Sequence, residues 1–204
     1  MNPLLPETLQ RGLILASASP RRAAILEMLG FEFEVMPTRA EENHIATAAP
    51  LEQARHLARL KAEEPADARQ QGIRIGADTI VVVDGRILGK PADDDAALDM
   101  LRLLRGRWHR VHTGLALHDL GTRRTLDAVE TTDVLFAHWD DDVLRRYVQT
   151  GEPADKAGAY AIQGLGAMLV REIRGCYYNV MGFPVARFLA LLRELHGAEV
   201  GNAC

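Results

Sequence analysis

A carboxylate interrupts an otherwise apolar run in the first half of the chain. Asp78 lies within residues 76–83, and it is followed by Thr79 and then by four aliphatic residues. An apolar strand disfavours a charged side chain, so Asp78 needs a metal ion, a cation partner or a catalytic role, unless it faces water at a sheet edge. Asp78 is therefore the first candidate for acid–base or metal chemistry.

A second candidate is the segment 17–22 (SASPRR), which joins a short apolar run to a predicted helix. Ser19 suits the N-cap of that helix and Pro20 suits its first position. The helix N-terminus exposes backbone N–H groups and a positive dipole end, which Arg21 and Arg22 oppose. An anionic ligand such as a polyphosphate would resolve this conflict. The alternative is a plain capped helix with two solvated arginines.

The basic residues are strongly biased towards arginine. Of 24 basic residues only three are lysines, namely Lys61, Lys90 and Lys156. In such a chain a lysine indicates a place where a compact ammonium serves better than a planar guanidinium, although chance could explain any single one. Lys90 follows Gly89 and precedes Pro91 in a segment that is not a Walker A loop, because its glycine spacing is short and it lacks the Ser or Thr that holds magnesium.

The segment 152–164 is rich in small residues, which allow a backbone to approach a ligand closely. Within it, Gln163 offers a donor and an acceptor that could match the edge of a base. The alternative is an ordinary tight loop with a surface amide. Two other clusters are interpreted as structural: residues 93–95 (DDD) as a helix cap with a solvated first turn, and His109 and His112 as strand residues that point to opposite faces.

Periodicity predicts a single α/β domain with a mixed sheet, because strands, helices and hairpins are interspersed without a regular βαβ array. Asp84–Gly85 is a strong hairpin signal. The expected strands are 12–16, 31–36, 73–83, 110–118, 125–137, 160–163 and 168–173, and the expected helices are 20–29, 50–62, 93–104, 140–150 and 184–195. The faces expected to be buried carry Ala24, Ile25, Met28 and Leu29 in the first helix and Leu51, Ala54, Leu57, Ala58 and Lys61 in the second.

The composition is that of a soluble globular protein. The 204 residues are 48% hydrophobic and 25% charged, and the formal net charge of -4 argues against a general nucleic-acid binder. Cys176 and Cys204 provide neither a disulfide framework nor metal-ligand spacing. No secretory signal and no membrane-spanning run is recognised, so we expect a cytoplasmic protein with no membrane partner.

Taken together, the motifs closely resemble the Maf family of nucleoside-triphosphate pyrophosphatases. The residues that carry this resemblance are SASPRR at 17–22, ADT at 77–79, GKP at 89–91, and DKAGAY at 155–160 with IQG at 162–164. Each motif is weak alone, but four in the family's order are specific, and the resemblance covers about residues 12–195. It implies an α/β fold with an elongated mixed sheet flanked by helices and a central cleft, like that of inosine-triphosphate pyrophosphatases. The expected organisation is an extension at 1–11, one catalytic domain of two lobes at 12–197, and a tail at 198–204.

The resemblance also implies roles for individual residues. Asp78 matches the proton acceptor, and Glu42 and Asp78 would hold a Mg²⁺ or Mn²⁺ ion. Arg21, Thr79 and Gln163 match positions tied to substrate choice. Arg22, Glu42, Lys61 and Lys90 match polar residues of the cleft. With Asp78, we expect Glu42, Lys61 and Lys90 to be catalytic, and we expect the loop with Ser17 to help bind the triphosphate.

Thr79 and Gln163 look like the branch of the family that acts on dTTP and UTP, because the branch acting on 7-methyl-GTP carries different residues there. The resemblance therefore implies hydrolysis to the monophosphate and pyrophosphate, possible cleaning of modified pyrimidine nucleotides from the pool, and a homodimer. The alternative is a non-enzymatic regulator of septum formation in cell division. A phosphate monoesterase would instead release orthophosphate.

Overall fold

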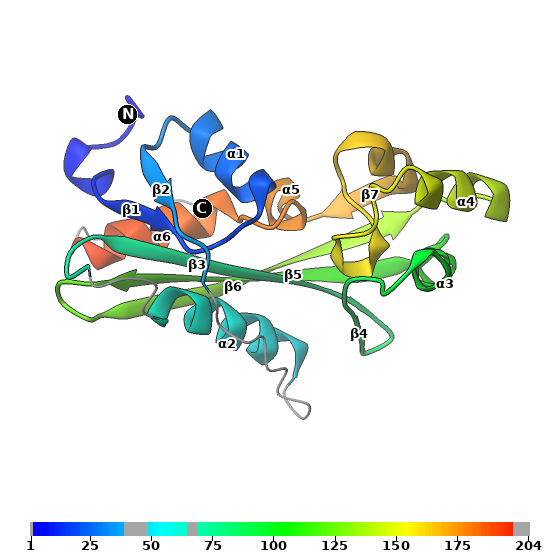
Figure 1. Ribbon diagram of the computed structural model, residues 1–204, viewed down its shortest axis with the longest axis horizontal. Helices are drawn as coiled ribbons and strands as arrows, with labels where there is room; N and C mark the ends of the chain where they lie inside the picture. The colour runs from blue at the N-terminus through cyan, green and yellow to red at the C-terminus, as the bar shows by residue number, and fades with distance from the viewer. Residues whose placement is uncertain (1, 39–48, 65–68, 198–204) are drawn as a thin grey trace. The chain divides into compact units, whose positions relative to one another are not determined.

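The chain forms a mixed sheet of seven strands with helices packed on it, as the computed structural model shows (Figure 1). Residues 2–38, 49–64 and 69–197 are described. The strand order is β2-β1-β3-β5-β6-β7, with β4 paired to β3; β1 is parallel to β2 and β3, whereas β4 and β7 are antiparallel to their partners. The strands are β1 (Leu13–Leu15), β2 (Phe33–Val35), β3 (Ile73–Val83), β4 (Arg86–Leu88), β5 (Trp108–Asp119), β6 (Thr125–Phe136) and β7 (Val170–Arg174). The expected α/β class with a mixed sheet is confirmed.

Five helices agree with the predicted ranges: α1 (Pro20–Met28), α2 (Pro50–Glu63), α3 (Asp94–Leu104), α4 (Asp141–Gln149) and α6 (Val185–Leu195). The short helix α5 (Tyr177–Val180) was not predicted, nor were the 3-10 turns η1 (Glu7–Leu9), η2 (Ala157–Ala159) and η3 (Gly164–Leu169). None of the helices in the described ranges is both long enough and apolar enough to cross a membrane.

The chain divides into two compact units. Unit 1 comprises Met1–Asp78, Gly114–Val129 and Gly182–Cys204, and unit 2 comprises Thr79–Thr113 and Glu130–Met181. The boundary falls within β3, β5 and β6, so each of these strands contributes one part to each unit. The central cleft that the resemblance implies stays a prediction.

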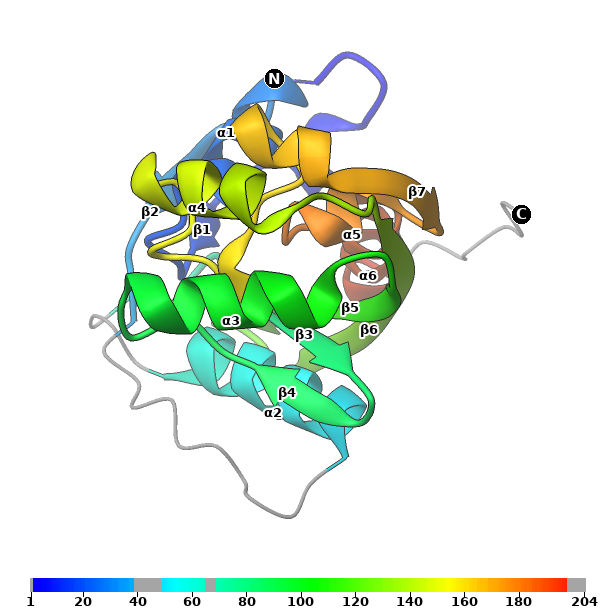
Figure 2. The same ribbon diagram turned by 90° about the vertical axis from the view of Figure 1, so that its right-hand side faces the viewer.

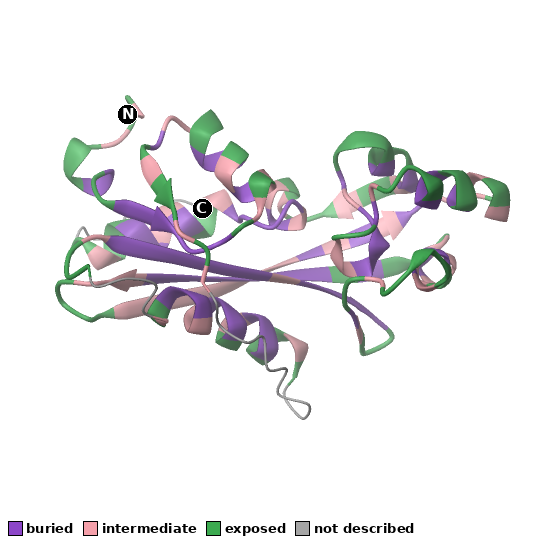
Figure 3. Ribbon diagram, viewed as in Figure 1, coloured by how far each residue is buried: buried purple, intermediate pink, exposed green. Residues whose placement is uncertain are grey.

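In unit 1, helix α2 packs very closely on the sheet because two strand positions are glycine. A Cβ on Gly76 would lie 2.2 Å from the carbonyl oxygen of Ala58 and 2.6 Å from the backbone nitrogen of Ala62. A Cβ on Gly114 would lie 2.0 Å from the carbonyl oxygen of Ala54. Side chains at these two positions would push the helix away. Buried residues accordingly dominate β1, β3 and the inner face of α2 (Figure 3).

The buried face of helix α1 differs from the predicted one. Ile25 is buried as expected, but Ala24 and Met28 are exposed and Leu29 is only half-buried. The buried residues beside Ile25 are Leu26 and Arg22. The packed stripe therefore follows the spacing 22, 25, 26, which sequence reasoning passed over because it includes an arginine. In α2 the prediction was correct except at Leu51, which is 44% exposed.

The N-terminal segment caps helix α1. The side-chain amide of Asn2 donates to the carbonyl oxygen of Leu29, the C-cap residue, at 2.7 Å. Gln10 is 2% exposed and donates from Nε2 to the carbonyl oxygens of Asn2 and Leu5. Carbonyls at a helix C-terminus lack intrahelical partners, so this contact stabilises the end of α1.

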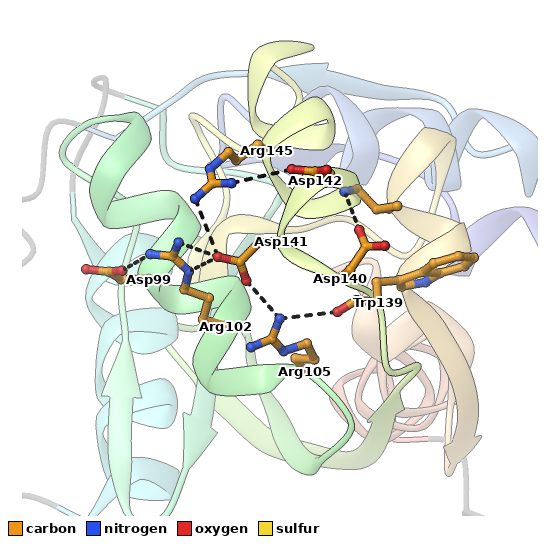
Figure 4. Close-up of polar contacts among 9 residues, drawn as sticks. Asp99, Arg102, Arg105, Trp139, Asp140, Asp141, Asp142 and Arg145 are labelled. Atoms are coloured by element: carbon orange, nitrogen blue, oxygen red, sulfur yellow. Dashed lines mark hydrogen bonds and ion pairs between the residues drawn. The ribbon is translucent and has the colours of Figure 1, made fainter.

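In unit 2, helices α3 and α4 lie side by side (Figure 2). Asp141 joins them by accepting from Arg102 Nη2 at 2.5 Å and from Arg105 Nη1 at 2.8 Å (Figure 4). The hydrogen bond from Arg102, and to a smaller extent the one from Arg105, holds the pKa of the Asp141 carboxyl below its ordinary value. About a third of each of these side chains is exposed to solvent, which weakens such ion pairs. We therefore ascribe the packing of α3 and α4 mainly to the buried cluster beneath them, which includes Val81, Leu101, Val134, Phe136 and Leu144.

Local signals in unit 2 were partly correct. Asp84 and Gly85 both have positive φ, 49° and 75°, and they connect β3 to β4 as the predicted hairpin turn. Asp93 caps α3 by accepting from the backbone of Ala96 at 2.8 Å, which confirms the cap interpretation. The predicted strand 160–163 was wrong: these residues form a bend between η2 and η3, because Gly158 and Ala159 turn the chain with φ of 69° and 57°.

Candidate functional site

The carboxylate of Asp78 lies against the ammonium of Lys61. Lys61 Nζ donates to Asp78 Oδ1 at 2.7 Å, and both side chains are only 11% exposed. Lys61 is placed there by α2, because Gly76 lets Ala58 and Ala62 pack onto β3 just before Asp78. Of the alternatives for Asp78, a cation partner is thus observed, and the water-facing position at a sheet edge is excluded.

The loop after β1 is organised by Arg22. This side chain is 8% exposed and donates from Nε to the carbonyl oxygen of Gly182 at 2.9 Å and from Nη1 to Ser17 Oγ at 2.8 Å. Ser17 Oγ also accepts from the backbone nitrogen of Ser19 at 3.3 Å. The solvated-arginine interpretation is therefore wrong for Arg22. A hydroxyl that accepts two hydrogen bonds still has its own proton to donate, so Ser17 suits an anionic oxygen.

The N-terminus of α1 carries no acidic residue in its first turn, and Ser19, its N-cap, makes no side-chain capping bond. Arg21 at this end is half-buried and has interactions of its own. Glu42, the other predicted metal ligand, lies outside the described residues. Within the described ranges no group of three His, Cys, Asp or Glu residues is arranged to hold a metal.

In unit 2, Thr79 follows Asp78 directly and rests on a buried polar network. Its Oγ1 is 3.0 Å from Thr113 Oγ1, and Thr113 donates to the carbonyl oxygen of Asn179 at 2.9 Å. Asn179 is fully buried and donates from Nδ2 to Thr132 Oγ1 and to the carbonyl oxygen of Val111. Sequence reasoning missed Thr113 and Asn179, because the pairing of β3 with β5 brings Thr113 to Thr79 and the packing of α5 brings Asn179 to Thr113.

Two motif segments of unit 2 meet through their backbones. Gly158 donates to the carbonyl oxygen of Gly89 at 3.0 Å, so the segment containing Lys90 lies against the segment 155–158. Gly158 has φ 69°, and a Cβ there would lie 3.0 Å from Val81 of β3. The Lys90 side chain itself is exposed. Lys156 is engaged instead, since it donates to the carbonyl oxygen of Glu152 at 2.6 Å.

Gln163 is exposed at the start of η3, and its side chain does not cap that turn. Its amide makes no hydrogen bond to a residue within the described ranges. An exposed amide fits both expectations for Gln163, a contact to a ligand and an ordinary surface amide, so its role stays a prediction.

The histidines of β5 are structural, as expected. His109 is buried, 2.7 Å from the hydroxyl of Tyr160 through Nε2, and edge-on to Phe136. Burial lowers the pKa of His109 to about 4 and raises the pKa of Tyr160 above its ordinary value. His112 contacts Thr131 Oγ1 through Nδ1 at 2.8 Å. The His109–Tyr160 contact anchors the segment that leads to Gln163.

The mixed sheet with its helices defines an α/β protein, in which one unit holds both the helix N-terminus that follows β1 and the buried Lys61–Asp78 pair. The chain belongs to the Maf family: the model described as "Maf-like protein" matches residues 12–195.

Several curated relatives are similar over nearly their full length, and each is named dTTP/UTP pyrophosphatase. The relative from Ruminiclostridium cellulolyticum is 44% identical over 91% of this chain and 97% of the relative. The relative from Carboxydothermus hydrogenoformans is 46% identical over 88% and 96%, and the one from Thermococcus gammatolerans is 50% identical over 92% and 98%.

Proposed function

We propose that this protein hydrolyses dTTP and UTP to the nucleoside monophosphate and pyrophosphate. The observation that carries the proposal is the identity of 44% to 50% with relatives named for that activity. Those names favour an enzyme over a regulator of septum formation.

The triphosphate is bound by the cations and by the end of α1. Ser17 donates its hydroxyl proton to a phosphate oxygen, and Arg22 beneath it adds a buried positive charge. Arg21 and Lys90 contribute further positive charge. The N-terminus of α1 adds the positive end of the helix dipole, which favours a phosphate.

Asp78 accepts the proton of the attacking water. Lys61 engages one oxygen of its carboxylate, and the second oxygen has no partner within the described ranges. The oxygen of the water forms a bond to the α-phosphorus, the bond from that phosphorus to the bridging oxygen breaks, and pyrophosphate leaves with the electron pair. Positioning and charge stabilisation supply most of the rate in such transfers.

We expect a divalent cation at Asp78 and Glu42, since the resemblance implies dependence on such an ion. Mg²⁺ is commonly held by one or two carboxylates together with substrate phosphates, so Asp78 and Glu42 would suffice as protein ligands. Bound there, Mg²⁺ or Mn²⁺ would neutralise charge on the phosphates.

Base choice is assigned to Gln163 and Thr79. The edge of uracil or thymine presents an acceptor, a donor and an acceptor, and a glutamine amide matches part of that pattern. A wrong base leaves the polar groups of the site unpaired. Cleaning of modified pyrimidine nucleotides, a homodimer and a cytoplasmic location remain predictions from the resemblance.

A nucleotide panel tests the proposal. Purified protein with Mg²⁺ or Mn²⁺ is given dTTP, UTP, dCTP, dATP, dGTP and 7-methyl-GTP at equal concentrations, and pyrophosphate and orthophosphate are measured separately. We expect pyrophosphate release, fastest from dTTP and UTP. Orthophosphate as the primary product would indicate a phosphate monoesterase, and a preference for 7-methyl-GTP would overturn the branch assignment.

A further inference from the structure

The loop that carries Gln163 is held by a side chain that lies eleven positions earlier. Glu152 accepts hydrogen bonds from the backbone nitrogens of Leu165 at 3.0 Å and Gly166 at 2.9 Å. It also accepts from the hydroxyl of Tyr147 at 2.9 Å. The carboxylate thus fixes the backbone two and three residues after Gln163.

Tyr147 fixes the other side of Gln163. Its ring is buried on α4, and its hydroxyl, while donating to Glu152, accepts from the backbone nitrogen of Ala161 at 3.3 Å. The backbone before and after Gln163 is therefore hydrogen-bonded to the same pair of side chains, Tyr147 and Glu152. The Gln163 amide itself takes no part in these contacts.

Two glycines allow the loop to wrap this closely around the pair. Gly164 has φ 65°, and a Cβ there would lie 2.6 Å from Glu152 Oε2. A Cβ on Gly166 would lie 2.6 Å from Tyr147 Oη and 2.3 Å from the carbonyl oxygen of Ala161. Each distance is shorter than van der Waals contact, so the loop path depends on glycine at both positions.

The carboxylate is suited to this task because it remains ionised. Partial burial alone would raise the pKa of Glu152, but the hydrogen bonds from Gly166, Leu165 and Tyr147, with the charge of Lys156, hold it below its ordinary value. Hydrogen bonds from backbone N–H groups to a carboxylate are stronger than those to a neutral acceptor.

We propose that Glu152, together with Tyr147, is a positioning residue that sets the direction in which Gln163 presents its amide and thereby governs base selection. This inference rests on the proposed function, in which Gln163 reads the base. Glu152 itself contacts no substrate. Its replacement should change which nucleotide is preferred, and not only how fast the protein turns over.

The test compares Glu152→Gln, Tyr147→Phe and Gln163→Glu with wild type. The readout is the ratio of kcat/KM for dTTP to that for dCTP, because this ratio does not depend on the fraction of folded protein. We expect Glu152→Gln to lower the ratio about tenfold, since a displaced contact group loses much of its discrimination. Tyr147→Phe should lower it less, because one hydroxyl is lost while the carboxylate remains.

The matched control is Glu172→Gln, which removes an exposed carboxylate of β7 that bonds Arg174 at 3.1 Å. It should leave the ratio unchanged. The double variant Glu152→Gln with Gln163→Glu should have the ratio of Gln163→Glu alone, because Glu152 acts through Gln163.

The outcomes separate the two proposals. If wild type releases no pyrophosphate from dTTP, the proposed function fails. If wild type discriminates, Gln163→Glu changes the ratio and Glu152→Gln does not, the positioning role is overturned while the enzyme stands. If Gln163→Glu also leaves the ratio unchanged, base reading lies elsewhere and the positioning role is equally overturned.

Discussion

The candidate residues of the two units are held in different ways. In unit 1, Asp78 bonds Lys61 and Ser17 bonds Arg22, and all four are buried. In unit 2, Gln163 is exposed and its loop is held through backbone contacts to Glu152 and Tyr147. Buried charges must be paired, so the unit 1 set is fixed by its own bonds. The position of an exposed side chain, in contrast, is set by the loop that carries it.

The difference suggests a division of labour. Mutually bonded charges suit the chemical step, which needs fixed positions and charge stabilisation. A loop residue with an uncommitted amide suits recognition. Substitutions in unit 1 should therefore lower the rate for every nucleotide, whereas substitutions around Gln163 should change the choice among them.

The largest effect is expected at Asp78. Asp78→Asn keeps the shape and one acceptor for Lys61 but removes the proton acceptor, so kcat should fall by roughly a hundredfold or more for all nucleotides. Steady-state kinetics, with the unfolding midpoint as the check on folding, measure this. The exposed Asp99→Asn serves as control. Near-normal turnover in the Asp78 variant would remove this residue from the mechanism.

Replacing the two lysines by arginine tests whether the loss of activity is larger at a buried site residue than at an exposed one. Lys61→Arg puts a bulkier guanidinium where the ammonium and its partner Asp78 are both only 11% exposed, and we expect kcat/KM to fall by roughly ten- to a hundredfold. Lys90→Arg should cause a smaller but clear loss, because Lys90 is exposed and can adjust. Arg110→Lys on the surface is the control. Full activity in both lysine variants would refute the argument from lysine scarcity.

The smallest effect on activity is expected at His109, which should act on stability alone. The unfolded imidazole takes up a proton near pH 6.5 and the folded one near pH 4, so between these values the unfolded state binds more protons and stability falls as pH falls. The loss is on the order of 3 kcal/mol across that window.

Urea unfolding at pH 7 and pH 4.5 measures this loss of stability. His109→Gln, which keeps a hydrogen-bonding group but does not titrate, should show a smaller difference between the two pH values than wild type. The exposed His138→Gln should behave like wild type. Equal pH dependence in the His109 variant and wild type would show that the buried imidazole is not the cause.

Buried charged residues of the site could be predicted from the sequence, whereas residues placed by loop folding or strand pairing could not. Asp78 is visible as a charge in an apolar strand, and Lys61 as a lysine on a helical apolar face, because burial of charge is a local anomaly. Their contact required knowing that Gly76 lets α2 approach β3. Glu152 and Thr113 gave no such signal, since their roles depend on loop folding and strand pairing. The segment 160–163 misled the prediction because its alternating residues fit a strand, whereas the turn at Gly158 and Ala159 decides its path.

Hydrolysis of dTTP in ¹⁸O-labelled water tests the central claim most directly. If Asp78 activates water for attack at the α-phosphorus, the label appears in dTMP and the released pyrophosphate is unlabelled. Label in the pyrophosphate would place the attack at the β-phosphorus, and label in orthophosphate would place it at the γ-phosphorus. Either result would contradict the account.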